Sequence, residues 1–228
     1  MTNNILSLFQ LCDSNLPTGA FSHSFGLESY IQEDKVHDKE TFFEWLKVYL
    51  HEQLIYTDGL ASLLVYEALT EGNIQEIWHL DRLLTVQNLP RETREGTQMI
   101  GDRMLKLTES LYELPILSQY RAEIKKKNAF GHPAIVFTMV AHGLEVEKQD
   151  TIRFYLYSSI SSQIQNAVRA IPLGQTAGQM ITHNFIPELN MAVDKILQLS
   201  IDDFGIVSPG IELSQMQHER VNIRIFMS

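Results

Sequence analysis

The stretch HPAIVFTMVAHGL, residues 132–144, is apolar on nearly every side when it is drawn as a helix. A helix of this kind has to be covered all around by other parts of the chain, so the stretch predicts a buried helix. Apolar residues recur at helical spacing on both sides of it, between Arg91 and Leu114 and between Asp150 and Val168. The spacing therefore predicts long amphipathic helices packed around an apolar one.

Capping and breaking residues separate the other helical segments. Thr41 and Glu44 are spaced as a capping box, which predicts a helix start at Thr41. Gly72 predicts the end of a helix over residues 58–70, and Pro90 follows the end of the next one.

The fold class follows from these patterns. No segment of useful length alternates apolar and polar residues as a strand does. We expect an all-α, single-domain bundle of about nine or ten helices. Its helical domain is expected to span residues 1–207, and residues 208–228 are expected to form an irregular C-terminal tail, because helical periodicity fades after Ser200.

Composition narrows the function classes. The chain has 228 residues, and 28 acidic residues outweigh 18 basic ones to give a net charge of −10. A nucleic-acid binder is expected to be basic, so nucleic acid is excluded as a partner. Cys12 is the single cysteine, and neither a secretory signal nor a run of about 20 apolar residues is present. We expect a cytoplasmic protein that does not contact a membrane.

Ser14 to Tyr30, SNLPTGAFSHSFGLESY, is the densest cluster of turn-forming and polar residues. Ser22, His23 and Ser24 have the residue types of a nucleophile and its base, so a small hydrolase is one alternative. Neighbouring side chains on one turn point in different directions, however, which disfavours a chained triad. We therefore favour a capped helix start that presents polar groups to a partner.

Metal and nucleotide sites are not evident in the sequence. The eight histidines are scattered, without the close pairs of a zinc-type motif, although His23 is the best candidate ligand. A stand-alone nickel carrier stays an alternative. Gly174 and Gly178 lack the Lys-Ser/Thr of a phosphate loop, so we interpret them as small residues that let two helices pack closely. No cofactor is expected.

Three motifs together resemble one family. LPTGAFSHSFGLE in residues 16–28, VRAIPLGQTAGQ in residues 168–179 and the terminal RIFMS are similar to motifs of the urease accessory protein UreF. The resemblance implies a non-enzymatic chaperone that dimerises. It also implies three partners: a UreD/UreH-type accessory protein, the GTPase UreG and the urease apoprotein, into which the assembly inserts nickel.

The same resemblance implies a set of partner-binding residues. Glu28 is expected to be an exposed contact or gating residue for the GTPase step. Tyr30 and Arg224 are expected to form a coupled pair that links the signature helix to the tail, and the tail is expected to order only on a partner. The full set is Glu28, Tyr30, Arg169, Gln175, Arg224 and Phe226, with Phe226 buried in the assembled complex.

Overall fold

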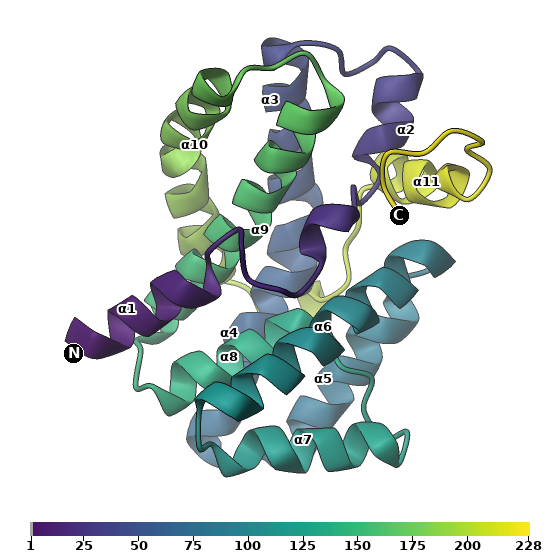
Figure 1. Cartoon of the computed structure of the whole chain (residues 1–228). Helices are drawn as coiled ribbons and strands as arrows, with labels where there is room; N and C mark the ends of the chain where they lie inside the picture. The colour runs from purple at the N-terminus through teal and green to yellow at the C-terminus, as the bar shows by residue number, and fades with distance from the viewer. Residues whose placement is uncertain (1) are drawn as a thin grey trace.

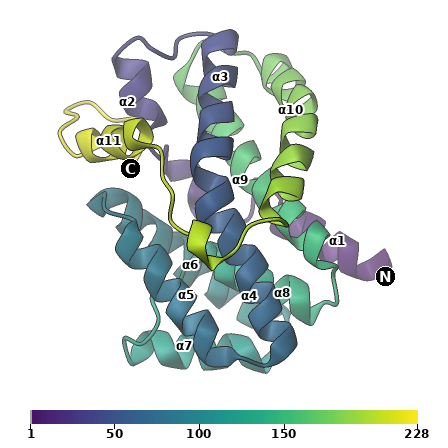
Figure 2. The same ribbon diagram turned by 180° about the vertical axis from the view of Figure 1, so that it is seen from behind.

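The computed structural model describes residues 2–228, with side chains from Asn4 on, and these residues contain helices and loops but no strand. Figure 1 shows the arrangement, and Figure 2 shows it from behind. No helix in this part of the chain is both long and apolar enough to cross a membrane. The α-helices are α1 (Thr2–Leu11), α2 (Leu27–Gln32), α3 (Lys39–Tyr49), α4 (Leu60–Glu71), α5 (Ile74–Gln87), α6 (Arg91–Leu111), α7 (Pro115–Lys125), α8 (Pro133–Gly143), α9 (Lys148–Ala170), α10 (Gln175–Ile196) and α11 (Pro209–His218).

The predicted apolar helix is α8, and it lies at the centre of the lower half of the molecule in Figure 1. Every residue from Pro133 to Ala141 is buried. Helices α4, α6 and α9 all pack against it. The prediction of a buried helix at residues 132–144 is confirmed, since a helix without a polar face is stable only when it is enclosed.

Helices α3 and α4 form one continuous rod, joined by π-helical turns at Leu50–Gly59. Figure 2 shows the rod running from the top of the molecule into its lower half. Counting it as one helix, residues 2–228 contain ten helical rods, which agrees with the all-α expectation. Two short 3-10 turns, Ala20–Ser22 and Ile201–Asp203, lie outside these rods.

Two apolar clusters fill the interior. The lower one lies among α1 and α4–α8, and the upper one lies among α2, α3, α9, α10 and α11. Helices α4 and α9 contribute to both clusters, through Val65 and Leu60 and through Tyr155 and Leu156. The signature segment crosses the boundary between the two halves, so its position depends on both.

Some helix ends differ from the expectation. Helix α3 begins at Lys39, because Asp38 is its cap: the Asp38 carboxylate accepts from the Thr41 amide at 2.8 Å, and Thr41 completes the box. Both residue types are good caps, and the earlier one is used. The end at Gly72 is confirmed, with φ at 72° in the left-handed region that glycine tolerates.

The two glycines near residue 175 differ from each other. A Cβ on Gly178 would lie 2.8 Å from Cγ2 of Val168, so α9 and α10 approach closely there, as predicted. A Cβ on Gly174 would meet nothing within 4 Å, because Gly174 precedes α10 in an extended conformation. Close packing is therefore confirmed for Gly178 and wrong for Gly174.

The C-terminal region is more ordered than expected. Helix α11 occupies Pro209–His218, half of the segment for which an irregular tail was predicted. Its buried face consists of Ile211, Ser214, Gln215 and His218. Since three of these four are polar, hydrophobic periodicity could not reveal the helix.

Candidate partner-binding site

The signature segment is a chain of tight turns rather than one helix start. Gly19 has φ of 81°, and Phe25 and Gly26 have φ of 51° and 95°. Helix α2 begins only at Leu27: Ser22 ends the short turn Ala20–Ser22, and His23 and Ser24 lie between that turn and the helix. The left-handed residues turn the chain so that the amide of Ser24 and the carboxylate of Glu28 both face the C-terminal tail.

Glu28 is the centre of this contact. One carboxylate oxygen accepts from the Ile225 amide at 2.6 Å, and the other accepts from the Phe226 amide at 3.1 Å. Glu28 is 2% exposed. The exposed side chain expected for Glu28 is therefore wrong, whereas its part in the GTPase step stays a prediction. Glu28 holds the tail of its own chain, with backbone amides replacing water around the carboxylate.

His218 bridges Glu28 to a second carboxylate. Its Nε2 lies 2.9 Å from Glu28 Oε2, and its Nδ1 lies 2.9 Å from Glu92 Oε2, at the first turn of α6. Arg224 of the tail donates to the other oxygen of Glu92 at 2.8 Å. Burial by itself raises the pKa of Glu92, but the hydrogen bonds from His218 and Arg224 outweigh burial and lower it. We call Glu28, His218, Glu92 and Arg224 the tail clamp.

Tyr30 and Arg224, the expected coupled pair, contact different groups. Arg224 bonds to Glu92 and to the carbonyls of Val221 and Glu219. Tyr30 instead lies beside α11, where a Cβ on Gly210 would be 2.9 Å from its hydroxyl oxygen. Both residues therefore lie near the C-terminal region, but each one contacts other groups.

The end of the tail docks on the signature segment. The Met227 amide donates to the Ser22 carbonyl at 2.7 Å, and the Ser24 amide donates to the Ser228 carbonyl. Phe226 is buried, and the Arg169 guanidinium lies 5.1 Å from its ring centroid. Phe226 was expected to be buried only in a complex, and the tail was expected to order on a partner. In the single chain Phe226 is already buried, and the tail is already docked.

Arg169 belongs to this site, and Gln175 does not. Arg169 donates to the Phe21 carbonyl and to Asn166, and Asn166 in turn donates to the His23 carbonyl at 2.7 Å. Gln175 is exposed at the first turn of α10, outside the tail clamp.

The hydrolase geometry is not formed. His23 lies 2.7 Å from the Ser228 hydroxyl rather than beside Ser22 or Ser24. Burial, together with Arg103 and His218, lowers its pKa to about 4, which makes it a weak base at neutral pH. The Ser24 hydroxyl accepts from the Glu28 amide. These serines are therefore structural residues of the turn.

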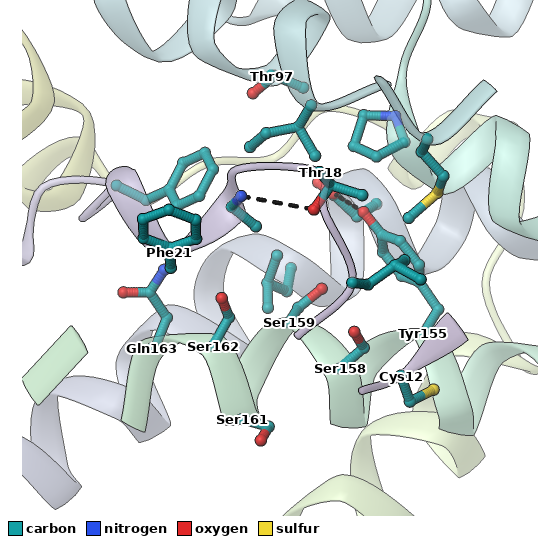
Figure 3. A pocket seen from close by; sticks show the side chains of 18 of the residues that line it. Cys12, Thr18, Phe21, Thr97, Tyr155, Ser158, Ser159, Ser161, Ser162 and Gln163 are labelled. Carbon is teal, nitrogen blue, oxygen red and sulfur yellow. Dashed lines mark hydrogen bonds between the residues drawn. The ribbon is translucent and has the colours of Figure 1, made fainter. Parts of the chain in front are cut away.

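A cavity of about 140 Å³ lies behind the signature segment. Hydroxyls of Ser159 and Ser162 from α9 lie across it from Thr18 of the signature segment (Figure 3). His132 also lines it, but its Nδ1 accepts from the Ala134 amide, so in the neutral ring the proton sits on Nε2. That nitrogen then has no lone pair for a metal. Among the described residues, no three His, Cys, Asp or Glu side chains gather as metal ligands.

Comparison with known proteins decides the family. The UreF family model matches residues 36–186. A relative named urease accessory protein UreF, from Bacillus sp. (strain TB-90), is 51% identical over 226 residues, which is 99% of this chain and 100% of the relative. This chain belongs to the UreF family. The recognition made from three motifs is confirmed, and the family is one of accessory proteins rather than enzymes.

In this UreF-family chain the tail presents an apolar outer edge. Phe226 and Ser228 point inward, whereas Ile223, Ile225 and Met227 are exposed, with Ile223 at 86%. Exposed large apolar residues that lie together commonly mark protein contacts. Phe21 of the signature segment is also exposed and lies under Arg169. We call Phe21, Ile223, Ile225 and Met227 the apolar edge.

Sequence reasoning missed Glu92 and His218, the two residues that complete the clamp. Glu92 reads as an ordinary acidic residue in a helix first turn, which the helix dipole favours on its own. His218 lies 190 positions from Glu28. The available signal was a polar residue on the buried face of a helix. Recognising that signal required knowing where α11 begins and ends.

Proposed function

We propose that this chain is a scaffold of urease maturation in the cytoplasm. It bridges a UreD/UreH-type accessory protein and the GTPase UreG on apo-urease and assists nickel insertion. Membership of the UreF family supports a role in urease maturation. The docked tail supports a role in which one rigid surface recognises a protein partner, since preorganised surfaces bind without a large ordering penalty.

The observation that carries this proposal is the apolar edge. Ile225 and Met227 alternate with the buried Phe226 and Ser228, so the tail is fixed on one side and open on the other. The inner side is held by Glu28 and by the signature backbone. We assign the outer side to the UreD/UreH-type protein, because an exposed apolar row with a fixed backbone has the composition of an interface core.

The test is a charge placed on the edge. Ile225→Asp changes a side chain that is 58% exposed, so the fold should keep its melting temperature while capture of the UreD/UreH-type partner falls at least about tenfold. Val86→Asp on α5 is the matched control, at 57% exposure, and should bind as before. Equal capture by both variants would remove the edge from the interface.

Deleting Arg224 to Ser228 is the stronger form of the same test. The helical body should stay folded by circular dichroism, because neither apolar cluster contains a residue from Arg224 to Ser228, although Phe226 is buried against the signature segment. Capture of the UreD/UreH-type partner, and of the GTPase through it, should be abolished. A pull-down with and without UreG separates a direct GTPase contact from an indirect one.

Self-association is a second part of this proposal. Helix α1 extends away from the body in Figure 1, and its residues Ile5, Leu6 and Phe9 are exposed. We assign this face to a homodimer. Phe9→Asp should shift the sedimentation of the chain toward a monomer, and an unchanged dimer would place the contact elsewhere.

The nickel-carrier alternative has its own test. We expect the purified chain to bind neither GTP nor stoichiometric nickel tightly, because its sequence lacks the phosphate-loop lysine and close ligand pairs. Isothermal titration calorimetry that finds one tightly bound nickel ion per chain would favour the carrier.

A further inference from the structure

His218 is in an unusual position for a histidine. It is 0% exposed, at the end of α11, and both of its ring nitrogens lie 2.9 Å from carboxylate oxygens. An ionised carboxylate only accepts hydrogen bonds, so each ring nitrogen has to donate. Only the doubly protonated, positively charged ring satisfies Glu28 and Glu92 at once.

The charges around His218 come from every element that packs on it. Glu28 lies on α2, Glu92 on α6 and Arg224 on the tail, and His23 of the signature segment is near enough to interact electrostatically. Without the ring charge, the buried Glu28 carboxylate would have no cation beside it, and Glu92 would keep only Arg224. Removing one partner of a buried ion pair leaves an uncompensated charge, which strongly disfavours the closed arrangement.

Three of the neighbouring groups, His23, Glu92 and Arg224, keep one protonation state between pH 6 and 9. Burial and nearby charges lower the pKa of His23 to about 4, so it is neutral there. The hydrogen bonds that lower the pKa of Glu92 keep it ionised, and arginines such as Arg224 stay charged.

We propose that the His218 imidazolium is a proton-operated lock that fixes the tail and with it the apolar edge. When the ring loses its proton, one carboxylate loses its donor, and the amides of Ile225 and Phe226 lose the Glu28 position that holds them. His218 and Glu92 are thus positioning residues for the docking surface. The lock belongs to the single chain and holds whether or not the edge binds the partner assigned to it above.

The direction of the pH effect follows from proton counting. The closed arrangement, in which both ring nitrogens donate, needs the charged ring, whereas an arrangement in which α11 and the tail have separated from Glu28 and Glu92 does not. The closed state therefore holds a proton that the open state releases when the pH is high enough. Docking therefore weakens as pH rises, by up to about tenfold in the opening equilibrium for each pH unit.

Hydrogen exchange of the purified full chain tests the lock. Protection of the Ile225 and Phe226 amides, corrected for the intrinsic exchange rate, should fall between pH 6 and 9, while α8 amides keep theirs. His218→Gln donates to one carboxylate only, so tail protection should be at least about tenfold lower at pH 6 and almost independent of pH.

Glu92→Gln is the deciding variant. Its amide nitrogen can donate to Nδ1 and its oxygen can accept from Arg224, so a neutral His218 that donates through Nε2 to Glu28 satisfies every group. The tail should stay protected, and the pH slope should flatten, which a purely structural residue would not produce. A slope that matches the unmodified chain in Glu92→Gln, or a fully protected tail in a folded His218→Gln, would overturn the proposal.

Discussion

The surroundings of α8 and the surroundings of Glu28 are equally buried, yet they are stabilised in different ways. Around α8 the contacts are apolar, between helices whose patterns can be recognised separately. Around Glu28 they are hydrogen bonds and charges between segments up to about 200 positions apart. Apolar packing tolerates neighbours of any similar shape, whereas each group of the clamp needs one particular partner.

Because of this difference, the two regions respond differently to pH. Apolar burial changes little with pH, so α8 fixes the fold under all conditions in which the chain stays folded. A buried network of charges depends on the protonation of each member. A change in pH can therefore alter the polar region around Glu28 without unfolding the molecule.

The apolar region should respond most strongly to truncation. Phe137→Ala removes a side chain that is almost fully buried in α8, and we expect a loss of about 4 kcal/mol in the free energy of unfolding. Urea denaturation followed by circular dichroism measures it. A loss below about 1 kcal/mol would mean that α8 is not the packing centre.

Glu28→Ala should act locally. It leaves His218 and two tail amides without their acceptor, and we expect about 3 kcal/mol, much of it lost as undocking of the tail. Limited proteolysis should cut the tail first and the helical body later. Glu33→Ala, at an exposed position one turn on, is the control and should cause almost no change.

His23 should make the clamp region sensitive to acid. Its pKa is lowered to about 4 in the folded chain, so the unfolded chain takes up a proton first as pH falls below about 6.5. The contribution of His23 is present above that pH and is lost as pH falls toward 4, up to about 3 kcal/mol. His23→Gln should flatten unfolding free energy against pH in this window; an unchanged slope would assign the acid sensitivity to other groups.

The two glycines give the smallest contrast. Gly178→Leu should destabilise the chain by about 2 kcal/mol, because its side chain would enter the space of Val168. Gly174→Leu is the matched control in open space and should stay within about 0.5 kcal/mol. Thermal melts of the pair decide whether α9 and α10 pack as described.

The sequence was sufficient for the helices and for the family, but not for the site. Helices such as α5 and α8 have local patterns, and the glycine that ends α4 has a local conformational cause. Glu28 was recognised from its motif but given the wrong environment, because burial of a carboxylate depends on donors that lie far away in the chain. Asp38 was overlooked as a cap for a simpler reason: two good capping residues stood three positions apart.

The 197 positions between Glu28 and Ile225 also matter for the order in which the molecule folds. Closing so long a loop has a large entropic penalty, and the contacts that reward it are few until both apolar clusters exist. The tail should therefore dock in a late kinetic phase, after the helices have assembled. Until then Phe226 and the apolar residues beside it stay in water, so a slow-folding population would be the form most prone to aggregate.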